Sequence, residues 1–163
     1  MCAKTNNGIL NPLLFDTKAQ KLPDHNSILI FLVDDNELYL RSLEVQFKMN
    51  PDLTIKTFTS GEACIKSLSE NPDVIVLDYF LNSQDDSAID GFKTLLKIKE
   101  ASPGTNVIML SSHEATDVAV KCIKNGAFDY IVKNDVTFYR LKQAIKKIFS
   151  IFSVEKELIV WDW

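Results

Sequence analysis

Short runs of aliphatic residues recur along the chain and alternate with longer segments whose apolar positions lie three or four residues apart. The runs occupy residues 28–33, 53–58, 74–78, 107–110 and 128–132. An unbroken aliphatic run bounded by polar residues is typical of a buried strand, whereas apolar positions at i, i+3 and i+4 indicate an amphipathic helix. The sequence therefore predicts five strands, and the alternation of Ile55 with polar neighbours makes the second of them an edge strand.

Helices are predicted after each strand. Asn36 is a candidate N-cap for the first helix, and Thr59 and Glu62 have the spacing of a capping box at the start of the second. Gly91 opens the third, and Gly126 is placed as the C′ residue of the fourth. Five strand–helix pairs in strict alternation imply an α/β fold with a parallel, doubly wound sheet. The predicted helices are 37–49, 60–70, 91–102, 114–125 and 136–149.

Four of the five predicted strands end in a polar or charged residue. Asp34 and Asp35 follow the first strand, Asp78 ends the third, Ser111 follows the fourth and Lys133 follows the fifth. Parallel strands have their carboxyl ends at the same edge, which is where open α/β folds bind their ligands. We therefore expect these side chains to lie close together.

This set of side chains suggests a specific chemistry. Three carboxylates at one edge repel each other, and Mg²⁺ relieves the repulsion because it binds one or two carboxylates while accepting phosphate oxygens. A lysine and a hydroxyl there would bind an anionic group, so the set suits phosphoryl transfer. Asp78 is the natural nucleophile, since it ends the central strand and carboxylates form acyl phosphates.

Composition narrows the class of protein. The chain has 163 residues, 46% hydrophobic and 25% charged, which suits one globular domain with some extra chain. A net charge of −4 argues against direct nucleic-acid binding, and no apolar run approaches the roughly 20 residues that span a bilayer. Cys2, Cys64 and Cys122 lack the spacing of a zinc site and suit a reducing compartment. We expect a cytoplasmic protein without membrane contacts.

The polar residues that follow the strands resemble those of a response-regulator receiver domain of two-component signalling. The resemblance rests on Asp34-Asp35, Asp78, Asp90-Gly91, Ser111 and the segment Tyr130-Ile131-Val132-Lys133, all in order and with fitting spacing. It covers about residues 28–149. It implies a flavodoxin-like (βα)5 fold whose five-stranded parallel sheet has the order 2-1-3-4-5.

The resemblance also implies a site. Asp78 would accept a phosphoryl group from a histidine kinase or phosphotransfer protein, and Lys133 would contact the phosphoryl oxygens. Asp35, Asp78 and the backbone carbonyl of Phe80 would bind Mg²⁺, with Asp34 assisting. The chain would then be a signalling phosphoacceptor and not an enzyme with other substrates, since it would catalyse only its own phosphorylation and dephosphorylation.

A switch follows from the same resemblance. Ser111 would hydrogen-bond to the phosphoryl group, and Tyr130 would move inward behind it. This movement would alter the surface formed by the fourth helix, the fifth strand and the fifth helix. That surface would bind a downstream protein or a second copy of the chain.

The chain departs from the family pattern in three places. Asn134 stands where a proline is usual, and the segment 79–90 is longer than usual, so it could gate phosphodonors or contact a partner. Phe80 and His113 occupy the two positions that vary in the family and tune the lifetime of the phosphoryl group. Their bulk would hinder the attacking water, which predicts slow self-dephosphorylation.

The predicted domain organisation is an arm at 1–26, a receiver domain at 27–150 and an apolar tail at 151–163. The tail either folds back on the receiver, mediates dimerisation, or leads into a longer protein, and we favour packing or dimerisation. Asp85-Asp86 is expected to be solvated loop.

Three rival functions are considered. A phosphorylation-independent pseudo-receiver would have lost the acceptor, a magnesium-binding acid or the lysine, and all are present. A flavodoxin-like cofactor binder would not place Asp34-Asp35 where its phosphate binds. An aspartate-dependent phosphatase would carry a second acid shortly after the nucleophile, but Tyr79 and Phe80 follow Asp78.

Overall fold

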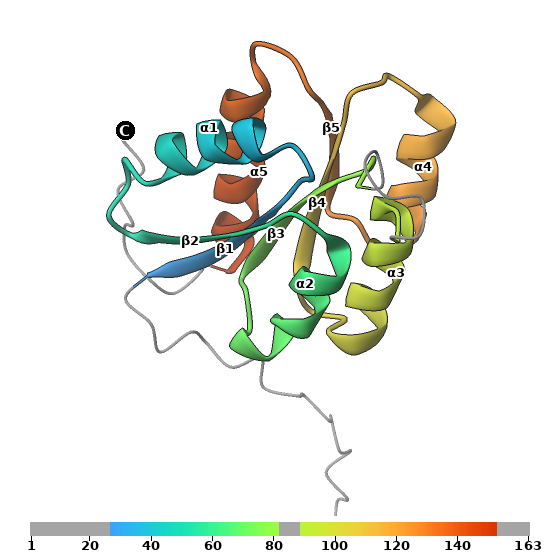
Figure 1. Ribbon diagram of the computed structural model, residues 1–163, viewed down its shortest axis with the longest axis horizontal. Helices are drawn as coiled ribbons and strands as arrows, with labels where there is room; N and C mark the ends of the chain where they lie inside the picture. The colour runs from blue at the N-terminus through green and yellow to red at the C-terminus, as the bar shows by residue number, and fades with distance from the viewer. Residues whose placement is uncertain (1–26, 82–88, 153–163) are drawn as a thin grey trace, which may run out of the picture.

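The computed structural model describes residues 27–81 and 89–152, which form three layers with a parallel sheet in the middle (Figure 1). The sheet has the strand order β2-β1-β3-β4-β5, so the predicted α/β fold and its order 2-1-3-4-5 are confirmed. The strands are β1 (Ile28–Val33), β2 (Leu53–Phe58), β3 (Val74–Asp78), β4 (Asn106–Ser111) and β5 (Asp129–Val132). The helices are α1 (Glu37–Phe47), α2 (Gly61–Lys66), α3 (Gly91–Ala101), α4 (Thr116–Lys124) and α5 (Thr137–Phe152), with a 3₁₀ turn, η1 (Leu68–Glu70).

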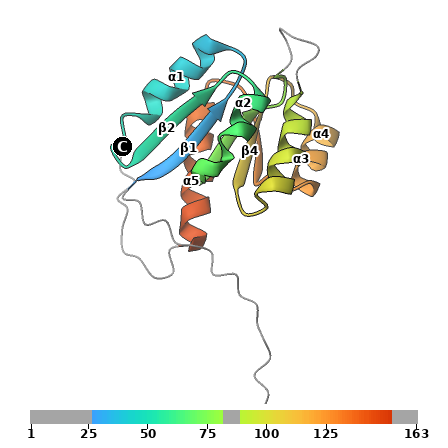
Figure 2. The same ribbon diagram turned by 60° about the horizontal axis from the view of Figure 1, so that its bottom comes forward.

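Each face of the sheet is covered by a different group of helices. Helices α1 and α5 pack on one face and α2, α3 and α4 on the other, as both views show (Figures 1 and 2). All five residues of β3 are buried, and β2 alternates buried and exposed positions as expected of an edge strand. Burying one large aliphatic side chain contributes roughly 1.5–3 kcal/mol, so the central strands anchor the fold.

Two helix starts lie beside the carboxyl edge of the sheet. Asn36 is the N-cap of α1, and its side chain accepts a hydrogen bond from the Tyr39 amide at 3.1 Å. Asp90 caps α3 in the same way. Gly91 brings α3 close to β3, because a Cβ at this position would lie 2.0 Å from the carbonyl oxygen of Asp78. The predicted Gly126 at the end of α4 has φ +94°, the left-handed conformation of a C′ residue.

The second helix differs most from its prediction. The capping box predicted from Thr59 lies one residue too early. Ser60 is the N-cap, and its hydroxyl accepts a hydrogen bond from the Ala63 amide. Glu62, which was assigned to the box, instead accepts a hydrogen bond from the Ile89 amide at 2.9 Å. The helix ends at Lys66, and η1 replaces its predicted last turn.

The bounds of the other helices also shift. Helix α1 ends at Phe47, two residues before the predicted end. Helix α4 begins at Thr116, two residues later than predicted, and its N-cap, Ala115, has a methyl side chain that makes no capping hydrogen bond. Helix α5 continues to Phe152 instead of ending near residue 149, because Ile148 still packs in the core and no helix breaker follows it.

Several predictions lie outside the described residues. These are the arm at 1–26, the centre of the long loop at 82–88, which contains Asp85-Asp86, and the tail from residue 153 onward. Within 27–81 and 89–152, no helix has both the length and the apolar character that a membrane span requires.

Candidate functional site

Three carboxylates meet at the carboxyl edge of the sheet. One carboxylate oxygen from each of Asp34, Asp35 and Asp78 lies within 4.8 Å of the other two. Asp34 and Asp78 are buried, with 2% and 3% of their surface exposed, and Asp35 is half-buried. The acids that the sequence placed after β1 and β3 are therefore adjacent in space.

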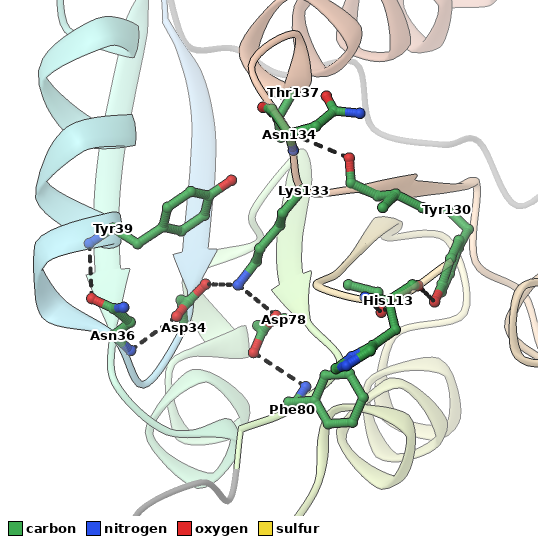
Figure 3. A network of polar contacts seen from close by, with 12 residues as sticks. Asp34, Asn36, Tyr39, Asp78, Phe80, His113, Tyr130, Lys133, Asn134 and Thr137 are labelled. Atoms are coloured by element: carbon green, nitrogen blue, oxygen red, sulfur yellow. Dashed lines mark hydrogen bonds and ion pairs between the residues drawn. The ribbon is translucent and has the colours of Figure 1, made fainter. Parts of the chain in front are cut away.

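Lys133 reaches from the end of β5 to two of these acids (Figure 3). Its Nζ lies 2.6 Å from Asp34 Oδ2 and 2.7 Å from Asp78 Oδ1. Only 17% of the lysine side chain is exposed, so solvent screens these ion pairs weakly. Burial opposes the charged form of Lys133, but Asp78 and Asp34 outweigh it and raise the pKa of the lysine. Lys133 is therefore an ammonium at neutral pH.

Asp78 is less well compensated than its partners. Burial raises its pKa, Lys133 lowers it, and Asp34 and Asp35 raise it again, with a net upward shift. Its Oδ2 accepts a hydrogen bond from the Phe80 amide at 3.1 Å. Its Oδ1 is buried and lies 2.7 Å from Lys133 Nζ as an ion pair. The site thus holds more negative than positive charge, since three carboxylates lie around one ammonium.

This donor set fits a hard divalent cation. Three carboxylates around one lysine leave uncompensated negative charge, and their oxygens are the ligands that Mg²⁺ prefers. The geometry of Asp34 is fixed independently, because its Oδ1 accepts from the Asn36 amide at 2.9 Å while its Oδ2 pairs with Lys133. The arrangement can bind a cation and, beside it, an anionic group.

Ser111 and Tyr130 are linked through His113. The Ser111 hydroxyl donates to the carbonyl oxygen of His113 at 3.1 Å and lies 3.2 Å from its amide, from which it accepts. The Tyr130 hydroxyl donates to the same carbonyl at 3.2 Å. Ser111 is buried and Tyr130 is half-buried. Their hydrogen bonds to His113 mean that the turn after β4 connects the two predicted switch residues.

Aromatic rings lie next to Asp78. The rings of Phe80 and His113 meet edge to face with centroids 5.2 Å apart, and Tyr79 packs on Phe80 at 5.0 Å. Phe80 is 39% exposed. The two residues nominated as tuning positions therefore contact each other on the solvent side of the site (Figure 3).

The turn after Lys133 is formed without a proline. The Asn134 amide donates to the Thr137 hydroxyl at 2.6 Å, and the Asn134 side chain accepts from the Val136 amide at 3.1 Å. These bonds form the turn of residues 134–136 between Lys133 and the start of α5 at Thr137. The hydrogen bonds of Asn134 thus stabilise the turn at the position where the family usually has a proline.

Tyr39 contacts the site and was not predicted to do so. Its ring lies below Lys133 Nζ, with 4.5 Å from the nitrogen to the ring centroid. The sequence could have indicated this contact, because Tyr39 is the third residue of α1 after the Asn36 N-cap and the first turn of this helix lies beside the acids. The apolar spacing of the helix indicated only Leu40, Leu43 and Phe47, which face the core.

Known proteins share this fold and sequence pattern. The family model for the response regulator receiver domain matches residues 30–146. A putative NtrX-like response regulator of Rickettsia felis is 35% identical over 119 residues, which cover 71% of this chain and 24% of that protein. The chain thus spans about a quarter of the length of such relatives.

Solved structures of receiver domains have a similar fold. The signal receiver domain of a putative Luxo repressor protein from Vibrio parahaemolyticus is 26% identical, with a TM-score of 0.64 over 80% of this chain and 99% of that one. A chain in the CheX-CheY-BeF3-Mg²⁺ complex from Borrelia burgdorferi is 25% identical, with a TM-score of 0.65 over 75% of this chain and 89% of that one.

Proposed function

The chain belongs to the response regulator receiver domain family, and from this premise we propose that it is a phosphorylation-activated switch that accepts a phosphoryl group on Asp78. The observation that supports this most directly is the contact of Lys133 with both Asp34 and Asp78, beside Asp35. Receiver domains are signalling domains, and the resemblance seen in the sequence is confirmed at that level. The phosphoryl chemistry of this chain is our proposal.

The phosphodonor would be a phosphohistidine on a histidine kinase or phosphotransfer protein. A carboxylate oxygen of Asp78 attacks the phosphorus, the P–N bond breaks, and the imidazole leaves with a proton from solvent. Lys133 already touches Asp78, so a small movement of its ammonium would bring it to the phosphoryl oxygens. This is positioning and charge neutralisation, which dominate catalysis of phosphoryl transfer.

Asp34, Asp35, Asp78 and the backbone carbonyl of Phe80 would hold Mg²⁺. Receiver domains bind this ion in an acidic pocket, and the clustered oxygens of the three acids suit it. When bound, the ion would neutralise the carboxylates and orient phosphoryl oxygens. The CheX-CheY-BeF3-Mg²⁺ complex from Borrelia burgdorferi, which contains a chain of similar fold, supports this assignment.

The response would begin at Ser111. Its hydroxyl is held by His113, and a phosphoryl group on Asp78 would offer it a stronger, charged acceptor. Breaking the Ser111–His113 bonds would free the turn that also anchors the Tyr130 hydroxyl. Tyr130 would then move inward, and the surface of α4, β5 and α5 would change.

Partners follow from this surface. We propose that it binds a downstream protein or a second copy of the chain, in the cytoplasm, and without direct contact to nucleic acid. The net charge of −4 supports the last point. The match covers only 24% of the length of the NtrX-like relative, so these partners are proposed for the receiver domain alone.

The alternative is a phosphorylation-independent interaction module. The presence of Ser111 and the contacts of Lys133 with both Asp34 and Asp78 argue against it. The test is chemical trapping: the protein is incubated with Mg²⁺ and acetyl phosphate, reduced with borohydride, and mapped by peptide mass spectrometry. Conversion of residue 78 to homoserine supports the proposal, and its absence, even with a phosphorylated histidine kinase supplied, favours the alternative.

A further inference from the structure

Tyr39 is the aromatic neighbour of the Lys133 ammonium. The distance of 4.5 Å from Lys133 Nζ to the ring centroid lies within the range of a cation–π contact. In Figure 3 the ring extends from α1 toward the Lys133 side chain, whose tip contacts Asp34 and Asp78. Among the described residues, the ammonium therefore contacts two carboxylates and one ring.

The contribution of Tyr39 lies in its ring and not in its hydroxyl. The hydroxyl is buried, has Thr137 as a polar neighbour, and makes no well-aligned hydrogen bond in the described part of the chain. The ring, in contrast, faces a cation that is only 17% exposed. Cation–π attraction grows when water is excluded, so this contact belongs to the stronger part of its range.

We propose that Tyr39 is a positioning residue that stabilises Lys133 in contact with both Asp34 and Asp78, and thereby lowers the affinity of the acid cluster for a divalent cation. The inference rests on the proposed function, because it takes the same acids as the magnesium ligands. An ammonium and a metal ion on shared carboxylates repel each other. Whatever stabilises the ammonium on these carboxylates must therefore weaken the binding of a cation to them.

The test is the dissociation constant for Mg²⁺, measured by calorimetric titration without any phosphodonor. Tyr39→Phe and its ring analogues with one, two and three fluorines keep the shape of the side chain and progressively weaken the π-face. From phenylalanine to trifluorophenylalanine, the dissociation constant is expected to fall stepwise by roughly fivefold. Tyr39→Phe is the reference of the series, so any effect of removing the hydroxyl, which lies near Thr137, is measured separately from the effect of the ring.

A double-mutant cycle distinguishes positioning from a structural role. In a Lys133→Met background the fluorinated series should have no effect on Mg²⁺ affinity, because no ammonium remains for the ring to hold. Tyr139→Leu is the matched control, since this tyrosine is 63% exposed on α5 and should leave the affinity unchanged.

The outcomes separate the two proposals. A dissociation constant that stays constant or rises along the series, or a dependence on fluorine that persists in Lys133→Met, overturns the role of Tyr39 alone. A wild-type protein that binds no Mg²⁺ overturns this role together with the proposed metal site.

Discussion

Lys133 Nζ lies 2.6 Å from Asp34 Oδ2, so one contact joins residues at the ends of β5 and β1, which are separated in the sheet by β3 and β4. The same ammonium lies 2.7 Å from Asp78 at the end of β3. Because only 17% of the lysine side chain is exposed, solvent screens these ion pairs weakly, and the cluster should contribute to stability.

Replacing Lys133 by methionine should destabilise the metal-free protein at neutral pH. It leaves two buried carboxylates without their cation, and breaking a buried pair in this way costs about 3 kcal/mol of unfolding free energy. Urea unfolding should show the loss, and Mg²⁺ should restore part of it. Lys48→Met is the control, since Lys48 pairs with Glu44 while 57% exposed and should change little. Equal effects of both variants would contradict the role of the buried pair.

The pH dependence of that loss has a fixed sign. The pKa of Lys133 is raised in the folded protein, because Asp78 and Asp34 outweigh the cost of burial. The stability it contributes is therefore fully present below the ordinary lysine pKa and is lost as the pH rises through the raised value. The difference between the wild type and Lys133→Met should stay constant near neutral pH and shrink only in strongly alkaline solution.

Asp78→Asn should stabilise the metal-free protein while abolishing its phosphorylation. The pKa of Asp78 is raised, chiefly by burial, so the ionised carboxylate is unfavourable in the folded state. The gain should be about 1 kcal/mol at neutral pH. It should vanish as the pH falls below the ordinary carboxyl pKa, where both side chains are neutral. Urea unfolding of both proteins across this pH range measures the difference in unfolding free energy. A less stable variant would show that the ion pair with Lys133 outweighs the cost of burying the Asp78 carboxylate.

Gly91→Ala should disturb the site indirectly, by displacing α3 from the strand that carries Asp78. The added Cβ would lie 2.0 Å from the Asp78 carbonyl oxygen, so α3 must move away from β3. We expect a loss of about 3 kcal/mol in unfolding free energy and slower phosphorylation. Gly104→Ala is matched to it, because a Cβ there meets nothing within 4 Å. If both substitutions have equally small effects, the close packing of α3 on Asp78 is not essential.

Phe80→Asn should shorten the lifetime of the phosphoryl group. Phe80 and His113 pack edge to face beside Asp78, and their bulk would keep water from the acyl phosphate. We expect dephosphorylation to be roughly tenfold faster. The measurement is the rate at which the phosphorylated species decays after the donor is removed. Leu96→Asn changes an apolar side chain of similar exposure on α3 and should have no effect. An unchanged lifetime in Phe80→Asn would remove the shielding role.

The sequence predicted the site because the sheet is parallel. Strand runs that end in Asp78, Ser111 and Lys133 must deliver those residues to one edge, whatever the details of packing. The sequence could not predict which acid pairs with Lys133, since Asp34 and Asp35 are adjacent and only the three-dimensional turn decides between them.

The remaining errors have the same physical origin. Thr59 and Ser60 both suit an N-cap, and the choice of Ser60 releases Glu62 to bind the Ile89 amide, a partner 27 positions away. The contact between Tyr39 and Lys133 likewise joins α1 to β5, so no local pattern encodes it. Local propensity predicts elements, whereas contacts between distant elements depend on how they pack.

The central claim is that Asp78 is the phosphoacceptor, and intact mass spectrometry tests it most directly. Wild type and Asp78→Asn are incubated side by side with Mg²⁺ and acetyl phosphate. The account predicts one phosphoryl adduct on the wild type, lost when the metal is chelated, and none on Asp78→Asn. An adduct on both proteins, or none on the wild type even with a phosphorylated histidine kinase supplied, would contradict it.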